Sequence, residues 1–375
     1  MKSKKIALVF PYAEPETGAP IARIDFFRRV LEGNGFEIKV LAPQKPDVKE
    51  TGEVLRFKGK IGLFNALRKE KPALAIASGP PAQAIFDTAL FSKILGFPAI
   101  ADARDPWVKA KVTLGILDEG SLKWRLQKKF EKTAYSLSKK IFAISPAVAW
   151  EIEALGVSKG KIRIIEHSAD TNAFRKDLKA GKEVRKELGI GKRPMLVYVG
   201  GAWVGIETMV EKISWMLKEK NAFLLLALSK SAFDPEQMFE KIREAVEKGG
   251  AGKNVKIMFN VQHGELFRYL SAADIGLNII PEKLNYVVSN KVKEYMACGL
   301  PVSCKCDPEC YSKEFIEGQG IGIVSGSWKE FAKKTSALIG SEKLGKLGKK
   351  ALEASKSFSH EKIGKKVLEE IEGIL

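Results

Sequence analysis

Short apolar runs rich in valine, isoleucine, leucine and alanine alternate with helical stretches along the chain. Runs of this kind are typical of parallel strands that helices cover on both faces of a sheet. In the first half, the pattern predicts strands at 6–10, 36–41, 73–77, 98–102, 140–144 and 161–165. In the second half, it predicts strands at 195–199, 223–228, 255–259, 274–280, 300–304 and 320–324. The fold class is therefore α/β.

The alternation breaks once, in a polar segment at 167–181 that shows no clear periodicity and that we interpret as a linker. A chain of 375 residues also exceeds the size at which one hydrophobic core keeps growing. We therefore expect two domains, 1–168 and 182–355, each with a Rossmann-like, doubly wound parallel sheet. The helical segment 359–375 is expected to pack back on the first domain.

Ligands of doubly wound sheets bind at the carboxyl ends of the strands. Two facing sheets of this kind would form one deep cleft between the domains. Segments that directly follow a predicted strand are therefore the first places to look for chemistry.

The segment 289–302 carries the most information, because it predicts a loop, a helix with a charged start and a buried strand. If Asn290 caps the helix, Lys291, Lys293 and Glu294 lie in its first turn, where free backbone N–H groups favour an anion. Lysine at this point opposes the helix dipole, so local stability does not explain it. A cation for phosphate beside a carboxylate for ribose hydroxyls suits a nucleotide. The alternative is a solvated charged turn.

Two loops of the first domain also follow predicted strands. Gly18 allows backbone to approach a ligand, and Arg23 lies in the next helical turn, where its cation would face that ligand. A flexible proline-rich connection is the alternative for this loop. In the second loop, Asp105 is placed to bond a sugar hydroxyl or to accept a proton, whereas an ion pair with Arg104 would be purely structural.

Glycines follow the first strand of the second domain. Gly200, Ala202 and Gly205 satisfy the pattern G-x-A-x-x-G, which indicates dinucleotide binding. The next strand, however, ends without an acidic residue to bind a ribose. A contact between the backbone amides of Gly200 and Gly201 and a nucleotide diphosphate fits the segment equally well.

The chain is strongly basic. The chain has 63 Lys and Arg against 45 Asp and Glu, a net charge of +18, which predicts attraction to nucleic acid, acidic membrane surfaces or phosphorylated substrates. A predicted amphipathic helix with an apolar stripe carries five of these cations: Lys123, Arg125, Lys128, Lys129 and Lys132. Such a helix indicates contact with anionic lipid headgroups, or else a core stripe with a solvated basic face. Because no nucleic-acid motif or aromatic interleaving is present, we expect no nucleic-acid partner.

No apolar run approaches the roughly 20 residues of a membrane span, and the first residues lack the apolar region of a signal peptide. We therefore expect a cytoplasmic protein, with peripheral contact to the inner face of the membrane. The cysteines at 298, 304, 306 and 310 match no common zinc spacing, so we expect reduced structural thiols and no metal.

Together, the segments 289–302 and 102–107 and the paired halves resemble GT-B glycosyltransferases of the retaining family-4 type, also called glycosyl transferases group 1. The likeness covers nearly the whole chain and is greatest to members that act in surface-polysaccharide assembly. It implies that the second domain holds a nucleotide-diphosphate sugar and the first a glycan or lipid-linked acceptor. It further implies transfer with retention of configuration, without a metal or cofactor.

The resemblance also implies roles for individual residues. Glu294 would hold the ribose hydroxyls, Lys291 the donor phosphate, and the region 260–264 the base. Donor-binding residues would be Gly18, Arg23, Gly200, Gly201, Val261, Ser289, Asn290, Lys291 and Glu294. Catalytic residues would be Asp105 and Lys291.

One departure from the family matters. Relatives carry an arginine and a lysine after the first strand of the second domain, whereas this chain has Gly-Ala-Trp-Val at 201–204. Arg23, Lys291 and Lys293 are the cations expected to compensate. The missing pair supports one alternative, a non-catalytic nucleotide-sugar or glycan-binding relative. A GT-B sugar-nucleotide epimerase and a dinucleotide oxidoreductase are the others.

Overall fold

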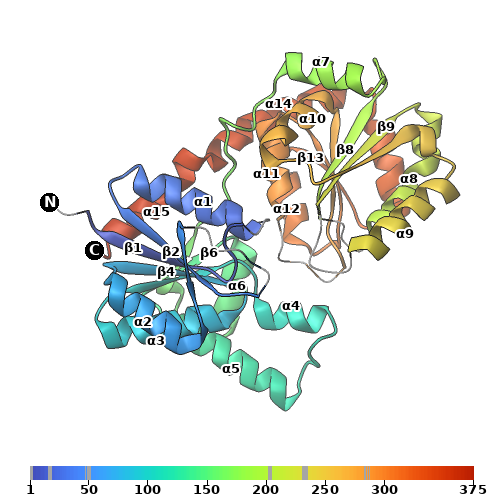
Figure 1. Ribbon diagram of the computed structural model, residues 1–375. Coiled ribbons are helices and arrows are strands. Elements are labelled where there is room, and N and C mark those ends of the chain that lie inside the picture. Colours follow the sequence, from blue (N-terminus) through green and yellow to red (C-terminus); the bar gives the residue numbers. More distant parts are fainter. Residues whose placement is uncertain are drawn as a thin grey trace. The chain divides into compact units, whose positions relative to one another are not determined.

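A computed structural model describes residues 3–15, 19–46, 48, 52–201, 205–229, 235–282, 284, 286 and 288–375 (Figure 1). The chain forms two compact units. Unit 1 contains Met1–Ser168 and His360–Leu375, and unit 2 contains Ala169–Ser359.

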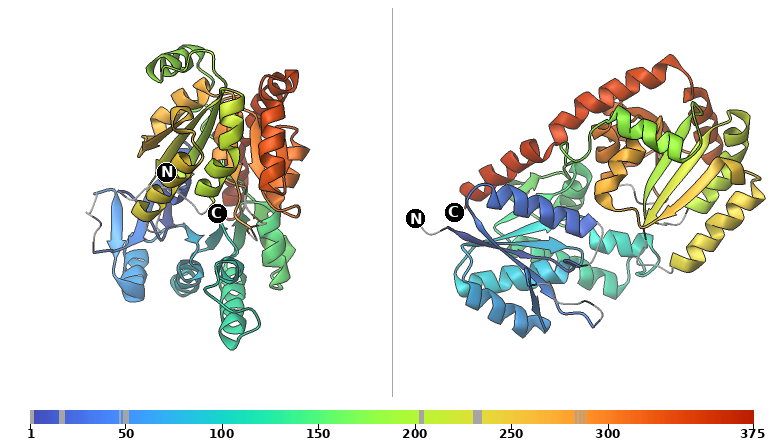
Figure 2. Two further views of the ribbon diagram at one scale, coloured as in Figure 1. Left: turned by 90° about the vertical axis from the view of Figure 1, so that its right-hand side faces the viewer. Right: turned by 45° about the horizontal axis from the view of Figure 1, so that its top comes forward.

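Unit 1 is built on a seven-stranded sheet in the order β3-β2-β1-β4-β5-β6-β7, with all neighbours parallel. The strands are β1 (Lys5–Val9), β2 (Glu37–Pro43), β3 (Val54–Phe57), β4 (Leu74–Gly79), β5 (Ala99–Ala103), β6 (Lys140–Ala143) and β7 (Ile162–Ile164). The helices are α1 (Ala19–Glu32), α2 (Gly59–Glu70), α3 (Ala82–Leu95), α4 (Trp107–Thr113), α5 (Leu122–Leu137), α6 (Pro146–Ala154) and α15 (His360–Glu372). Helices α1 and α15 lie side by side on one face of the sheet, and α2 and α3 cover the other (Figures 1 and 2).

Unit 2 contains a six-stranded parallel sheet in the order β10-β9-β8-β11-β12-β13. The strands are β8 (Met195–Gly201), β9 (Phe223–Ser229), β10 (Val255–Phe259), β11 (Ile275–Ile279), β12 (Val302–Lys305) and β13 (Gly322–Ser325). The helices are α7 (Leu178–Glu187), α8 (Ile206–Glu219), α9 (Pro235–Lys248), α10 (Leu266–Ala272), α11 (Asn290–Ala297), α12 (Tyr311–Gly318), α13 (Trp328–Leu338) and α14 (Glu342–Ser355). The α/β prediction is confirmed.

All twelve predicted strands are present within one or two residues of the expected positions, and β3 is the described strand that the pattern missed. Strand β3 has four residues at the edge of its sheet, and only Val54 is buried. It therefore lacks the continuous apolar run of a central strand. The expected linker 167–181 also contains the start of α7, which packs on α10.

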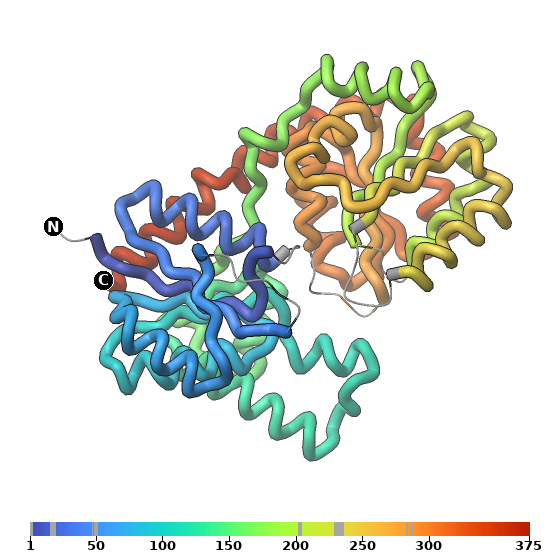
Figure 3. Tube along the Cα trace, viewed as in Figure 1, coloured from blue at the N-terminus to red at the C-terminus, as the bar shows by residue number. Residues whose placement is uncertain are grey.

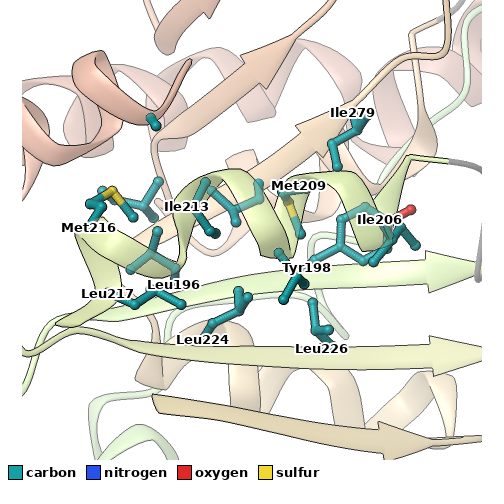
Figure 4. Close-up of a cluster of buried hydrophobic side chains, with 14 of the residues drawn as sticks. Leu196, Tyr198, Ile206, Met209, Ile213, Met216, Leu217, Leu224, Leu226 and Ile279 are labelled. Carbon is teal, nitrogen blue, oxygen red and sulfur yellow. The ribbon is translucent and has the colours of Figure 1, made fainter. Parts of the chain in front are cut away.

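The core of unit 2 lies between the sheet and α8. Leucines at 196, 224 and 226 on the strands meet Met209, Ile213 and Leu217 on the helix, all fully buried (Figure 4). This burial holds α8 against β8, and Gly200 and Gly201 end β8 at the carboxyl edge of the sheet. The core thereby fixes the position of the candidate site.

Strands β8 and β11 separate at this edge. Their register pairs only Ile275 with Leu196 and Gly276 with Val197. Beyond these pairs, the Tyr295 hydroxyl accepts a hydrogen bond from the Val199 N–H at 3.1 Å and donates one to the Leu277 carbonyl at 3.2 Å. The buried side chain of one α11 residue thus bridges the gap between the two strands.

Tyr295→Phe should lower the free energy of unfolding by about 1–3 kcal/mol, because it leaves a buried N–H and a buried carbonyl without their partner. Urea denaturation measures the change. Tyr12→Phe, at an exposed position, is the matched control and should alter stability little. Equal stability of Tyr295→Phe and the parent would show that the bridge is unimportant.

Candidate nucleotide-sugar site

The site begins at the N-terminus of α11. Ser289 is the N-cap residue, but its hydroxyl makes no capping bond and instead donates to Oδ1 of Asn278 at 2.7 Å. Asn278 is completely buried near the end of β11, and its amide also contacts the Cys304 sulfur. The start of the helix is therefore fixed to the sheet, while the Ser289 side chain does not cap its first N–H groups. The cap is at Ser289 and not, as expected, at Asn290.

Lys291 reaches from α11 to the end of β8. Its ammonium group donates a hydrogen bond to the Tyr198 hydroxyl at 3.2 Å and lies 4.3 Å from the centre of that ring. Gly200 lies beside it with a φ of +138°, and a Cβ at this position would be 3.1 Å from Cε of Lys291. The positive φ favours glycine here, and a side chain at this position would also press on Lys291. The structure brings together Lys291, Gly200 and Gly201, which sequence reasoning assigned to one site.

Glu294 lies one turn later and is mostly buried, with a side chain 15% exposed. Its Oε1 atom is 2.8 Å from Nε2 of His263, whose ring packs on Phe174 at 4.9 Å between centroids. His263 follows half-buried Val261 in the loop after β10. The hydrogen bond thus brings the expected ribose residue and the expected base region to one place.

Lys293 is not placed to bind a ligand. It is 4% exposed, and its ammonium group lies 3.7 Å from the ring centre of Phe315 and 3.1 Å from that of Phe358. At i+3 from Asn290, it falls on the face of α11 that packs into unit 2. The expectation that Lys293 compensates for the missing cations is therefore wrong.

Arg23 is also not available to a donor, so its assignment to the donor site is wrong. It is 2% exposed, and its guanidinium bonds Asp102 at 2.8 Å and the backbone carbonyls of Ile165 and Glu166 at 3.0 Å each. The same group lies 4.7 Å from the ring centre of Phe27. A buried charge is tolerated only when it is paired and hydrogen-bonded, and these contacts meet that need inside unit 1.

Asp105 follows this buried network at the carboxyl edge of unit 1. Asp102 also accepts from Ser78, which in turn accepts from Arg104 at 2.9 Å. Burial raises the pKa of Asp105, and the charge of Arg104 partly opposes that rise. Within the described residues, the Asp105 carboxylate forms neither a hydrogen bond nor an ion pair. It is therefore placed to interact with another molecule.

Two of the remaining expected positions, Gly18 and the segment 202–204, lie outside the described residues. All four cysteines are buried free thiols, as expected, and burial raises the pKa of Cys298 to about 12. In the part of the chain that the structure describes, no three His, Cys, Asp or Glu side chains are grouped to hold a metal ion.

The basic residues expected to contact a membrane lie on α5. Lys123, Arg125, Lys129 and Lys132 are exposed, while Lys128 is half-buried with its ammonium group 4.5 Å from the centre of the Trp124 ring. No described helix has the length and apolarity that a membrane crossing requires.

Comparison with known proteins bears on the fold of the chain. Residues 230–362 match a family model described as glycosyl transferase-like. No curated protein sequence matches the chain. The structure superposes on sucrose-phosphate synthase from Thermosynechococcus elongatus with a TM-score of 0.80 at 16% identity, covering 99% of this chain and 98% of that one.

The chain has the GT-B fold of glycosyltransferases. HepE of Anabaena in complex with UDP-glucose gives a TM-score of 0.77 at 13% identity, covering 98% of this chain and 99% of that one. A glycosyltransferase from Rickettsia africae gives 0.77 at 13% identity, covering 100% and 99%. The resemblance to GT-B proteins seen in the sequence is thereby confirmed.

Several residues that shape these sites were missed by sequence reasoning. Tyr198 contacts Lys291 from another element, and no local pattern shows that it does so; His263 lies in the expected base region 260–264, but its hydrogen bond to Glu294 was not predicted. Lys305 could have been found, because a lysine that ends an apolar strand lies at the carboxyl edge of the sheet.

Glu131 in unit 1 is another residue that sequence reasoning missed. It is 2% exposed on α5, and its carboxylate accepts hydrogen bonds from the first N–H groups of α4, at Trp107 (3.0 Å) and Val108 (3.4 Å). Burial raises its pKa to about 7, against the opposing effect of these bonds. Glu131 therefore ties α4 to α5 with a group that titrates near neutrality.

Glu131→Gln should remove a pH dependence of stability. Between pH 4.5 and 7, folded protein keeps a proton that the unfolded chain has lost, so stability falls as pH rises, by roughly 3 kcal/mol in total. The glutamine variant should lack this decline when denaturation is followed across that range. Glu119→Gln, at an exposed position, is the control. A decline of equal size in parent and Glu131→Gln would refute the assignment.

Proposed function

We propose that this protein transfers a sugar from a nucleotide-diphosphate sugar to a glycan or lipid-linked acceptor, with retention of configuration. The observation that carries the proposal is the contact of Lys291 with Gly200 and Tyr198 at the carboxyl edge of unit 2. A cation, a close backbone approach and an uncapped helix start there suit a phosphate group. The match of residues 230–362 and the GT-B fold support the same conclusion.

Each group has a task in this proposal. Lys291 and the N–H groups at the start of α11 stabilise the diphosphate as it leaves, because charge develops on that group in the transition state. Its freed oxygen then receives the proton of the acceptor hydroxyl. Glu294 binds the ribose hydroxyls, and the loop with Val261 contacts the base.

Asp105 is the candidate for the acceptor side. Its carboxylate, which has no hydrogen bond or ion pair within the described residues, suits a hydrogen bond from an acceptor hydroxyl, while the freed oxygen of the diphosphate takes the reacting proton. In this proposal the donor binds to unit 2, and Asp105 contributes to acceptor binding in unit 1.

Lys291→Ala should weaken UDP binding about 10- to 100-fold, because a charged hydrogen bond contributes about 1.5–3 kcal/mol. Glu294→Ala should weaken it by about 10-fold or more, since its carboxylate would accept charge-assisted hydrogen bonds from the ribose hydroxyls. Calorimetric titration measures both, and Lys248→Ala on the exposed surface of α9 is the control. Unchanged affinity in both site variants would contradict the proposed donor site.

An assay of turnover separates the alternatives. UDP-, GDP- and ADP-sugars are incubated with and without a lipid extract, and products are resolved by NMR, which also reports the anomer formed. Acceptor-dependent transfer with retention supports the proposal. Formation of an epimerised sugar nucleotide in the absence of acceptor indicates an epimerase. Binding of a nucleotide sugar without its consumption indicates a non-catalytic relative. Stabilisation by NAD alone would indicate an oxidoreductase.

The hairpin of α4 and α5 supports a membrane location for the acceptor. It projects from the sheet of unit 1 (Figure 3). The segment from the end of α4 through the first turns of α5 exposes four apolar side chains: Leu114, Ile116, Leu122 and Leu126. On α5, Arg125 and Lys129 lie at i+3 from Leu122 and Leu126 and therefore flank them. Apolar groups with a basic rim suit an anionic lipid surface, although the turn also carries Asp118 and Glu119.

A variant with both Leu122→Ser and Leu126→Ser should lose most binding to phosphatidylglycerol vesicles. These leucines are 73% and 58% exposed, so folding should be unaffected. Ile61→Ser with Ile94→Ser, also exposed on unit 1, is the control and should bind like the parent. Vesicle sedimentation measures the effect. Parent protein that ignores these vesicles, or binds phosphatidylcholine vesicles equally, would contradict an anionic-membrane contact.

A further inference from the structure

Lys305 is a buried cation at the carboxyl edge of unit 2. It ends β12, and its side chain is only 6% exposed. Among the described residues, its one ionic partner is Glu282, whose carboxylate lies 3.6 Å away and is itself 75% exposed. A buried lysine with so exposed and distant a partner lowers stability, so stability does not explain why it is there.

The surroundings of Lys305 connect it to the N-terminus of α8. Its ammonium group lies 5.6 Å from the centre of the Trp328 ring. The same ring is 3.9 Å from the position that a Cβ on Gly205 would occupy, and Gly205 is the N-cap of α8. Trp328 is thus a common neighbour of the lysine and of the helix start.

Two carboxylates already occupy this region. The Gly205 N–H, at the start of α8, donates to the Glu207 carboxylate at 3.1 Å, and Glu282 neutralises Lys305. Both carboxylates lie where an anion is favoured, one at a helix N-terminus and one beside a buried cation. Each belongs to a side chain on the surface or in the first helical turn, where it can give way to a stronger anion.

Ser325 gives an independent indication. Its hydroxyl is buried, and within the described residues it has no hydrogen-bond partner. In the sheet, Ser325 is paired in register with Lys305, so both side chains project from the same face. A buried hydroxyl beside a buried cation leaves a place for an acceptor group.

We propose that Lys305, with Ser325 and the N-terminus of α8, binds the diphosphate of the donor. It would thereby provide the positive charge that the Gly-Ala-Trp-Val segment at 201–204 does not. This inference rests on the proposed function, because it assigns the phosphate end of the same donor. Lys291 would hold the diphosphate from α11, and Lys305 from the face of the sheet that α8 and α13 cover.

The test compares ligands that differ in phosphate. Lys305→Met should weaken binding of UDP by about 10-fold or more while leaving uridine binding unchanged, since only a phosphate contact is lost. Lys305→Arg should retain most of the UDP affinity. Lys212→Met is the matched control, because Lys212 lies on α8 and pairs with Glu211 at the surface. Glu282→Gln, which removes the competing carboxylate, should tighten UDP binding.

The outcomes are distinguishable by titration of UDP and of inorganic pyrophosphate. If the parent binds UDP and Lys305→Met binds it with the same affinity, this inference is overturned and the proposed function is left intact. If the parent binds pyrophosphate through Lys305 but binds no nucleotide, the anion site is retained and the nucleotide-sugar proposal is refuted. Parent that binds neither ligand would refute both. If Lys305→Met does not fold, the Glu282→Gln and Lys305→Arg titrations decide.

Discussion

The chemistry proposed for unit 2 depends on the separation of β8 and β11. Crossovers between parallel strands are right-handed, and the chain leaves these two neighbours toward opposite edges of the sheet, so α8 and α11 must lie on opposite faces. The strands consequently part at their carboxyl ends, and the Tyr295 hydroxyl closes the gap between Val199 and Leu277. Lys291 lies one helical turn before Tyr295, so the same anchor directs it to Gly200, the residue after Val199.

Positive charge at this edge is supplied differently from what the sequence led us to expect. Arg23 is bound to Asp102 in unit 1, and Lys293 lies against two phenylalanine rings. Of the three expected cations, Lys291 remains. The sheet topology brings one further cation, the buried Lys305, to this edge. Lys305 ends β12, whereas the family's usual arginine and lysine follow the first strand of the second domain.

Particular residues show how far the sequence could predict this structure. Strand positions followed from apolar runs, because burial on both faces imposes them, whereas the edge strand at Val54 had too little burial to leave that pattern. The charged start of α11 was recognisable because its residues are consecutive. Contacts that join distant segments, such as His263 with Glu294 and Arg23 with Asp102, depend on tertiary packing and have no local signature. Residue type alone also could not show that Lys293 points inward, since Glu294, the next residue along the helix, is less buried.

The central claim is that a nucleoside diphosphate binds where β8 and β11 separate, against the start of α11. Backbone hydrogen exchange of the full chain with and without UDP tests it most directly. The account predicts slower exchange at Gly200, Gly201 and the first turn of α11, with no change in α5. Protection confined to other segments, or no protection at saturating UDP, would contradict it.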